Sequence, residues 1–316
     1  MAAALAGTAR PTGLLRFEAS TEAMGSSYSV VVYGPDGVKL QQAVDAAFEE
    51  VHRLDDLLSN YKPSSEWSEV NRNAAGRPVR VSPEVFRLIS ACMDYSRRTE
   101  GAFDITVGPL MKLWGFYKGS GRMPHRAEIR AVMNRVGYRH VLLDPGQMTV
   151  RFDREGVEID PGGIGKGYAV DRMVEILRQY GITAAFVSGS ASSLYALGAP
   201  PSEPRGWKVE IRDPKSPAGH VAGLFLKDRS LSTSGSQEKF FRARGRVWSH
   251  IMDPRTGYPA QGMLEVSVIA PRTMDSEAWT KPTFVNGRQW AAKHLPHDFR
   301  AFICEDRTEK PCAWLP

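Results

Sequence analysis

Residues 158–171 are the part of this sequence whose residue types and spacing best suit the binding of an anion. They read Glu-Ile-Asp-Pro-Gly-Gly-Ile-Gly-Lys-Gly-Tyr-Ala-Val-Asp, with four glycines between positions 162 and 167. Glycine permits positive φ and a close approach of the backbone to a ligand. A helix that begins in such a turn directs free N–H groups and the positive end of its dipole at one point. Lys166 adds a charge and Asp160 an acceptor, so the segment suits a phosphate or pyrophosphate ester.

The familiar phosphate-binding motifs do not fit this segment. The P-loop pattern fails because no glycine lies five residues before Gly165, and the dinucleotide pattern Gly-x-Gly-x-x-Gly has no third glycine at the required place. Taken alone, the segment is read equally well as a tight turn with a solvated lysine.

Two other stretches carry polar residues in unusual surroundings. Asp104 lies between Phe103 and Ile105 within residues 101–116, which read as a buried strand that runs into a turn and an apolar helix start. A carboxylate is costly to bury unpaired, so we expect it to meet a ligand hydroxyl or amide, or a nest of backbone N–H groups. The turn-rich stretch 248–259 carries His250; a lone histidine in a turn is more often structural, although an imidazole can also take a proton from a hydroxyl.

The elements that must position these residues mix without regular alternation. A strand is predicted at 28–33, an amphipathic helix ends near Ser59, Ser82 caps a second helix, and Gly181 ends the helix after the glycine turn. Further predictions are a helix at 128–136, short strands at 139–160, strands at 183–198, 207–211, 222–241 and 266–270, and a helix at 276–293 interrupted at Pro282. This order favours an α+β fold of mixed, largely antiparallel sheets flanked by helices over a doubly wound parallel sheet.

Length and composition agree with one large domain. The chain has 316 residues, 42% of them hydrophobic, and we expect a flexible segment at 1–20 and a single domain of two intimate lobes at 21–316. The net charge of +6 is dispersed, which argues against a nucleic-acid partner. Three scattered cysteines indicate neither a disulfide framework nor a zinc site, and no apolar run predicts an integral membrane segment.

Six ordered segments together resemble the ApbE family, the FAD:protein FMN transferases. The resemblance runs from about Met24 to Gly287. Its segments are M-G-S-S-Y-S-V (24–30), S-N-Y-K-P-S-S-E (59–66), G-A-F-D-I-T-V-G-P-L with L-W-G-F (101–116), I-D-P-G-G-I-G-K-G-Y-A-V-D (159–171), S-T-S-G (232–235) and S-H-I-M-D-P-R-T-G-Y-P (249–259).

The resemblance implies an activity and a set of site residues. Members bind FAD, use Mg²⁺, split the pyrophosphate and pass FMN to a threonine or serine hydroxyl of a partner protein; some hydrolyse FAD to FMN and AMP instead. Members usually act outside the cytoplasmic membrane, which favours a periplasmic location, although the sequence itself also fits the cytoplasm. His250 matches the base that activates the acceptor, and Lys166 supplies charge. Tyr61 and Trp114 are expected to pack on flavin or adenine rings. The implied FAD contacts are Met24, Tyr61, Ala102, Phe103, Asp104, Asp160, Lys166 and Ile251.

The implied metal site departs from the family pattern. Members hold the metal by a backbone carbonyl at the position of Gly163 and by an Asp and a Thr, which become Glu277 and Lys281 here. Glu277 still offers oxygen, whereas an ammonium offers only donors. We expect Lys281 to occupy or repel the metal position, unless the register slips and Asp275 and Thr280 take over. Mg²⁺ is therefore doubtful, and two alternatives stay open: an FAD pyrophosphatase, or an FAD-binding protein that has lost the reaction.

A second departure lies in residues 188–193, which read Ser-Gly-Ser-Ala-Ser-Ser. Many relatives carry a glycine pair and an acidic residue here. The wall of the substrate site at this segment is therefore expected to differ from theirs.

Overall fold

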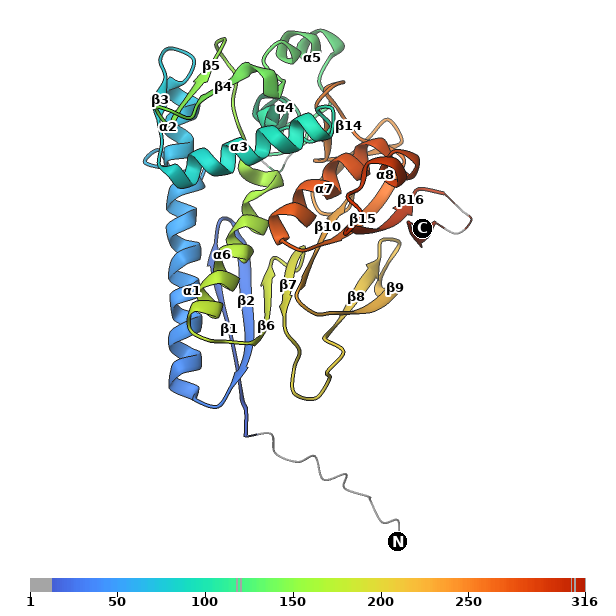
Figure 1. The fold of residues 1–316 in the computed structure, drawn as a ribbon. Coiled ribbons are helices and arrows are strands. Elements are labelled where there is room, and N and C mark those ends of the chain that lie inside the picture. The colour runs from blue at the N-terminus through green and yellow to red at the C-terminus, as the bar shows by residue number, and fades with distance from the viewer. Residues whose placement is uncertain (1–12, 118, 120, 308, 310, 316) are drawn as a thin grey trace.

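The computed structural model describes residues 13–117, 119, 121–307, 309 and 311–315. Its centre is an eight-stranded sheet in the order β1-β2-β6-β7-β10-β15-β16-β17 (Figure 1). Every neighbouring pair in it is antiparallel. The strands are β1 (Leu15–Ala23), β2 (Ser26–Gly34), β6 (Ala184–Gly189), β7 (Ser193–Leu197), β10 (Arg229–Gly235), β15 (Met263–Ala270), β16 (Arg300–Glu305) and β17 (Cys312–Trp314).

Three helices cover one face of this sheet. They are α1 (Gly37–Leu58), α6 (Gly165–Gln179) and α7 (Thr273–Asn286), and α6 contacts both of the others (Figure 1). Along β7, Tyr195 and Leu197 belong to the core under the helices, whereas Leu194 and Ala196 belong to a second core on the other face. That second face is covered by the hairpin β8 (Trp207–Asp213) and β9 (Ser216–Leu226). Because successive side chains of a strand point to opposite faces of the sheet, β7 contributes to two separate cores. The predicted α+β class is confirmed.

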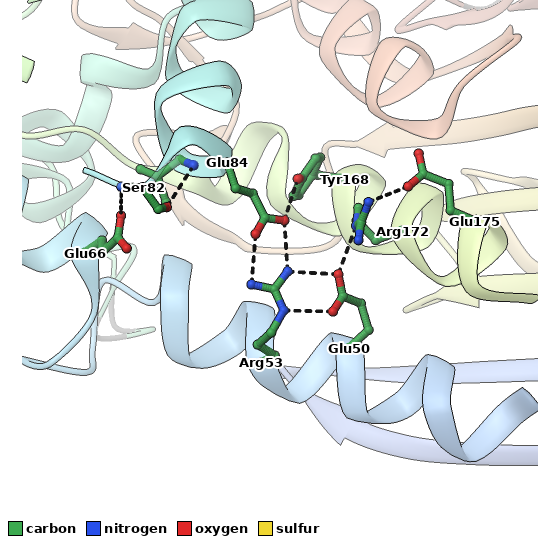
Figure 2. A network of polar contacts seen from close by, with 9 residues as sticks. Glu50, Arg53, Glu66, Ser82, Glu84, Tyr168, Arg172 and Glu175 are labelled. Carbon is green, nitrogen blue, oxygen red and sulfur yellow. Dashed lines mark hydrogen bonds and ion pairs between the residues drawn. The ribbon is translucent and has the colours of Figure 1, made fainter. Parts of the chain in front are cut away.

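A network of charged side chains joins three helices that are far apart in the sequence (Figure 2). Arg53 of α1 pairs with Glu50 at 2.8 Å and with Glu84 of α3 (Pro83–Arg98) at 2.8 Å. On α6, Tyr168 donates to Glu84 at 2.7 Å and Arg172 pairs with Glu50 at 2.9 Å. These partly shielded pairs hold α3 and α6 in a fixed relation to α1, and α6 carries the glycine turn of the site.

Smaller elements complete the fold at the end of the sheet where α3 lies (Figure 1). A third core cluster around the buried Trp114 joins residues 110–136 to residues 241–258. The remaining elements are α2 (Glu66–Asn73), β3 (Val79–Arg80), η1 (Ile105–Val107), α4 (Gly108–Leu113), α5 (Arg126–Met133), η2 (Tyr138–His140), β4 (Val141–Asp144), β5 (Thr149–Phe152), η3 (Pro161–Gly163), β11 (Phe240–Ala243), β12 (Arg246–Ser249), β13 (Met252–Asp253), β14 (Tyr258–Pro259) and α8 (Arg288–His294).

Several local predictions are wrong. Residues 15–20 are not a flexible segment, because they pair with β2 as part of β1, while residues 1–12 lie outside the described residues. Residues 101–116 form no strand; Asp104 instead caps η1, which leads into α4. The helix predicted at 276–293 is not interrupted at Pro282: α7 passes through this proline, and the break before α8 (Arg288–His294) comes at Gly287, whose φ of 80° is left-handed. A helix interior tolerates proline here because the surrounding core holds α7 in place.

Two further findings concern the cysteines and the membrane. Cys304 and Cys312 form one disulfide across β16 and β17, which the expectation of no disulfide framework did not include, and Cys92 is free and buried. The separation of the paired cysteines by eight residues carried no signal, because pairing depends on the hairpin that brings them opposite one another. Among the residues described, no helix has the length and apolar character needed to cross a membrane.

Candidate functional site

A cavity of about 1430 Å³ is lined by the start of α6, part of α7, the neighbouring loops and several strands, β2 and β8 among them. Pockets for small molecules usually measure roughly 300–1,000 Å³, so this one has room for a ligand as large as a dinucleotide. The fold brings twelve of the sequence-predicted site residues to its lining, although they come from distant segments; Trp114 is not among them. They are Met24, Tyr61, Ala102, Phe103, Asp104, Asp160, Gly163, Lys166, His250, Ile251, Glu277 and Lys281.

The glycine turn before α6 serves close packing more than unusual backbone angles. None of its four glycines has positive φ, so that prediction is wrong. A Cβ on Gly167 would lie 2.6 Å from the carbonyl oxygen of Thr273 and 2.8 Å from Oε2 of Glu277. Two of the N–H groups expected to be free are also taken, since Gly162 donates to Asp160 and Gly167 donates to Glu277. Glycine at 167 therefore lets α6 and α7 meet at the cavity wall.

The two buried aspartates are satisfied by the chain itself. Asp104 accepts hydrogen bonds from the Thr106 N–H at 2.8 Å, the Thr106 hydroxyl at 2.7 Å and the Tyr138 N–H at 2.6 Å, which is the backbone nest named among the alternatives. Burial nevertheless raises the pKa of Asp104 to about 6. Asp160 accepts from Gly162 N–H and from the hydroxyl of Tyr117, and burial raises its pKa as well. Both carboxylates shape the rim of the cavity.

Lys166 faces the cavity from the first turn of α6. Its ammonium donates to the hydroxyl of Ser192 at 2.7 Å. Just before Ser192, Ser190 and Ala191 have φ of 56° and 53°, a left-handed conformation that costs a non-glycine residue about 1 kcal/mol or more. This is the segment that is expected to depart from the family pattern, and its backbone is strained beside the lysine.

His250 also lines the cavity, directly after β12. Its Nδ1 is 3.3 Å from the carbonyl oxygen of Lys239, which can only accept, so Nδ1 carries the proton. Nε2 is left with its lone pair, 4.0 Å from Glu238. The pKa of His250 is lowered to about 4, mainly by desolvation and to a smaller extent by the positive charge of the nearby Lys281. The imidazole is therefore neutral at pH 7 and able to accept a proton.

The residues at the family's metal position do not fit a divalent cation. Lys281 Nζ lies 3.9 Å from Glu277 Oε1 and donates to the carbonyl oxygen of Glu277 at 3.2 Å. The Cε of Lys281 is 3.7 Å from the place of a Cβ on Gly163, so the lysine lies beside that backbone. Burial lowers the pKa of Lys281, while Glu277 opposes the shift. Within the described part of the chain, no three His, Cys, Asp or Glu side chains gather as metal ligands.

The proposed substitutes Asp275 and Thr280 are occupied elsewhere, so the register does not slip. Asp275 pairs with Arg272 at 2.8 Å and accepts from the hydroxyl of Tyr95. Thr280 donates to the carbonyl oxygen of Glu277 at 2.7 Å and lies 2.7 Å from the hydroxyl of Ser234. Neither residue lines the cavity.

The aromatic residues divide into one at the cavity mouth and one in the core. Tyr61 is 75% exposed and meets Tyr117 edge to face at 6.1 Å, a position open to stacking on a ring. Trp114 is fully buried, stacks on Trp248 at 5.4 Å and donates to the carbonyl oxygen of Gly257 at 3.0 Å. Its expected role beside a flavin or adenine ring is therefore wrong.

Sequence reasoning missed three residues that line the cavity. Tyr117 follows directly after the matched L-W-G-F segment, so extending that match by one position would have included it. Ser192 is the partner of Lys166, and Lys239 supplies the carbonyl that orients His250. These two pairings join segments 26 and 11 residues apart, and no local pattern announces them.

On this antiparallel α+β scaffold the cavity lining places Lys166, Lys239 and Lys281 near the neutral imidazole of His250, an arrangement that suits a protein that binds an anionic small molecule. The model of the ApbE family matches residues 24–303. An FAD:protein FMN transferase of Klebsiella pneumoniae (strain 342) is 34% identical over 267 residues, covering 82% of this chain and 81% of that protein. The chain belongs to the ApbE family.

Solved structures agree with this assignment. The ApbE protein of Thermotoga maritima superimposes with a TM-score of 0.85 and 31% identity, covering 94% of this chain and 98% of that one. The flavinyl transferase ApbE of Pseudomonas stutzeri, in its apo form, gives a TM-score of 0.83 at 26% identity, with coverage of 95% and 94%. The fold of this chain is thus that of the family.

Proposed function

We propose that this protein transfers FMN from FAD to a hydroxyl group of a partner protein, the activity for which its curated relatives are named. One observation carries the proposal: a neutral imidazole and an ammonium face the same dinucleotide-sized cavity in a chain of this family. FAD is the substrate, and the product is a protein carrying FMN through a phosphoester. We propose threonine or serine as the acceptor, because these side chains offer an aliphatic hydroxyl.

The transfer reaction needs a group that accepts a proton and a group that offsets negative charge, and His250 and Lys166 can serve these two purposes. The acceptor oxygen bonds to the phosphorus of the FMN half, the bond from this phosphorus to the bridging oxygen breaks, and AMP leaves with that oxygen. Nε2 of His250 takes the proton that the acceptor hydroxyl loses, because its pKa leaves it unprotonated. Lys166 offsets negative charge on the diphosphate. No step is assigned to Mg²⁺, since an ammonium lies at the metal position.

We further propose that the protein works outside the cytoplasmic membrane. The disulfide between Cys304 and Cys312 supports this location, because such bonds persist in oxidising compartments and are rare in the cytosol. Release of labelled periplasmic contents by osmotic shock of the source organism, with detection of this chain in that fraction, checks the location. Recovery with the cytosolic fraction alone would contradict it.

The test of the activity uses an acceptor protein with one acceptor threonine, and the same protein with valine in its place. The purified enzyme and FAD should yield a flavin-fluorescent band on a denaturing gel with the threonine form alone, together with one AMP for each FMN bound. AMP and free FMN without a band would identify a pyrophosphatase. FAD binding with no AMP would identify a binding protein. Either of these two results overturns the transfer reaction.

A further inference from the structure

The cavity contains a cation of its own at the place where the family holds a metal. The Lys281 ammonium lies 3.9 Å from the carboxylate of Glu277 and beside the backbone of Gly163, the same two positions that flank the family's metal. Both side chains reach this point from α7, one turn apart. The Glu277 side chain is only 3% exposed and the Lys281 side chain 23% exposed, so the charge pair is shielded from bulk solvent while Lys281 still lines the cavity.

The carboxylate of Glu277 is already engaged on both sides. One oxygen accepts from the Gly167 N–H at the start of α6, and the other faces Lys281. A divalent cation prefers six or more oxygen ligands, or several waters with one or two carboxylates. Here it would have to displace the Gly167 N–H or the ammonium, and the neighbouring Asp275 and Thr280 are bonded away from the cavity.

We propose that the Lys281 ammonium takes over the charge-neutralising work of the divalent cation, so that this enzyme cleaves the FAD diphosphate without a metal. The proposal rests on the function proposed above. A lysine cannot coordinate oxygen ligands as a metal ion does. Together with Lys166, however, it can place a positive charge beside the diphosphate. Glu277 then acts as a positioning residue: it orients the ammonium and ties α7 to the first turn of α6.

The first experiment measures AMP release from FAD by the full chain after treatment with excess EDTA, with and without added Mg²⁺. The two rates should agree within about threefold, because the catalytic charge is already present. Stimulation by Mg²⁺ of more than about tenfold would overturn the inference while leaving the proposed function intact. Absence of AMP under both conditions would count against the proposed function, and the second experiment then decides the inference.

The second experiment titrates the protein alone with Mn²⁺ and follows free Mn²⁺ by electron paramagnetic resonance. The wild type should bind none tightly, whereas E277D/K281T should gain one site per chain, because an aspartate and a hydroxyl replace the longer acid and the ammonium. K239T, which removes another cavity lysine away from Glu277, is the matched control and should gain no site. One Mn²⁺ bound per wild-type chain, or an equal gain in K239T, would refute the proposal.

Discussion

The chemistry of individual residues depends on how far each is removed from water. His250 is the clearest case, because its environment and not its type makes it a base at neutral pH. The Lys239 carbonyl holds the proton on Nδ1, and three cavity lysines disfavour a second proton. An imidazole in open solvent, with a pKa near 6.5, would be partly protonated under mildly acidic conditions.

We expect His250→Gln to abolish most of the transfer reaction. Glutamine fills similar space but cannot take a proton, so kcat for flavin transfer should fall by about 10²–10⁴-fold. FAD affinity should be retained, because the imidazole it replaces is uncharged. Gel fluorescence measures transfer, and quenching of flavin emission measures binding. Transfer within a fewfold of wild type would show that another group accepts the proton.

The titration of His250 provides a second residue-scale prediction. Its imidazole resonance in NMR spectra should titrate near pH 4 in the folded protein. Lys281→Met should move the midpoint upward, since it removes a positive charge that disfavours the imidazolium. Because the pKa of His250 is lower in the folded than in the unfolded chain, the unfolded chain binds the proton first as the pH falls. The free energy of unfolding therefore decreases as the pH falls from about 6.5 toward 4. A midpoint unchanged by Lys281→Met would contradict this coupling.

Residue types and their order were predictable, but their partners were not. Ten of the twelve predicted residues on the cavity lining lie in the six motifs, and the other two, Glu277 and Lys281, come from the segment that departs from the family pattern. The motifs did not show that Asp104 spends its hydrogen bonds on Thr106 and on Tyr138, 34 residues away. Nor did they show that Glu277 reaches a glycine 110 residues earlier. Such contacts arise from tertiary packing, which has no local signature in the sequence.

At the scale of elements, the contact between α6 and α7 shapes the cavity wall. Amphipathic spacing and the cap at Ser82 predicted two helices well: α1 ends at Leu58, next to Ser59, and α3 begins directly after Ser82. The strand predicted at 101–116 failed because apolar runs of this length do not distinguish a strand from a buried turn and short helix. The helix through Pro282 failed in the opposite way, because packing outweighed the local preference of proline.

Gly167→Ala tests the α6–α7 contact. The added Cβ would lie 2.6 Å from the Thr273 carbonyl, so the helices must separate, at a cost of about 1–3 kcal/mol in the free energy of unfolding. Urea unfolding measures the loss, and FAD affinity should fall with it. Gly223→Ala, where nothing lies within 4 Å of the new Cβ, is the control and should change stability by less than about 0.5 kcal/mol. Equal stability of the two variants would refute the close contact.

For the whole molecule, the order of the sheet is what sequence patterns did not supply. β2 pairs with β6, and β7 with β10, across long intervening segments. The alternation of residue types along a strand predicts which side chains share a face of the sheet, but not which strands lie next to one another. The division into two intimate lobes stays a prediction. The class of fold could be predicted because irregular mixing of strands and helices excludes regular βαβ repeats.

The stability of the whole chain should depend on pH through Glu265. Burial, with help from Glu238 and Asp213, raises the pKa of Glu265 to about 7, and one of its oxygens has no hydrogen-bond partner. The pKa of Glu265 is higher in the folded than in the unfolded chain. Its contribution to the free energy of unfolding is therefore complete below about pH 4.5 and is lost as the pH rises through 7. Glu265→Gln should therefore stabilise the protein at pH 8 by about 1–3 kcal/mol relative to wild type.

Unfolding in urea at pH 5 and pH 8 checks this expectation. The gain should be much smaller at pH 5, where the wild-type carboxyl is protonated and resembles the amide. Glu49→Gln, on the exposed side of α1, is the control for the loss of a surface carboxylate. A gain from Glu265→Gln that is equal at pH 5 and pH 8 would contradict a raised pKa.

The covalent link between β16 and β17 has a practical consequence for anyone preparing this protein. β17 is the outermost strand of the sheet and contributes Trp314, which rests on Phe302. In a cytosol rich in thiols we expect part of the protein to lack this disulfide. We therefore expect secretion, followed by purification without dithiothreitol, to give the more homogeneous sample.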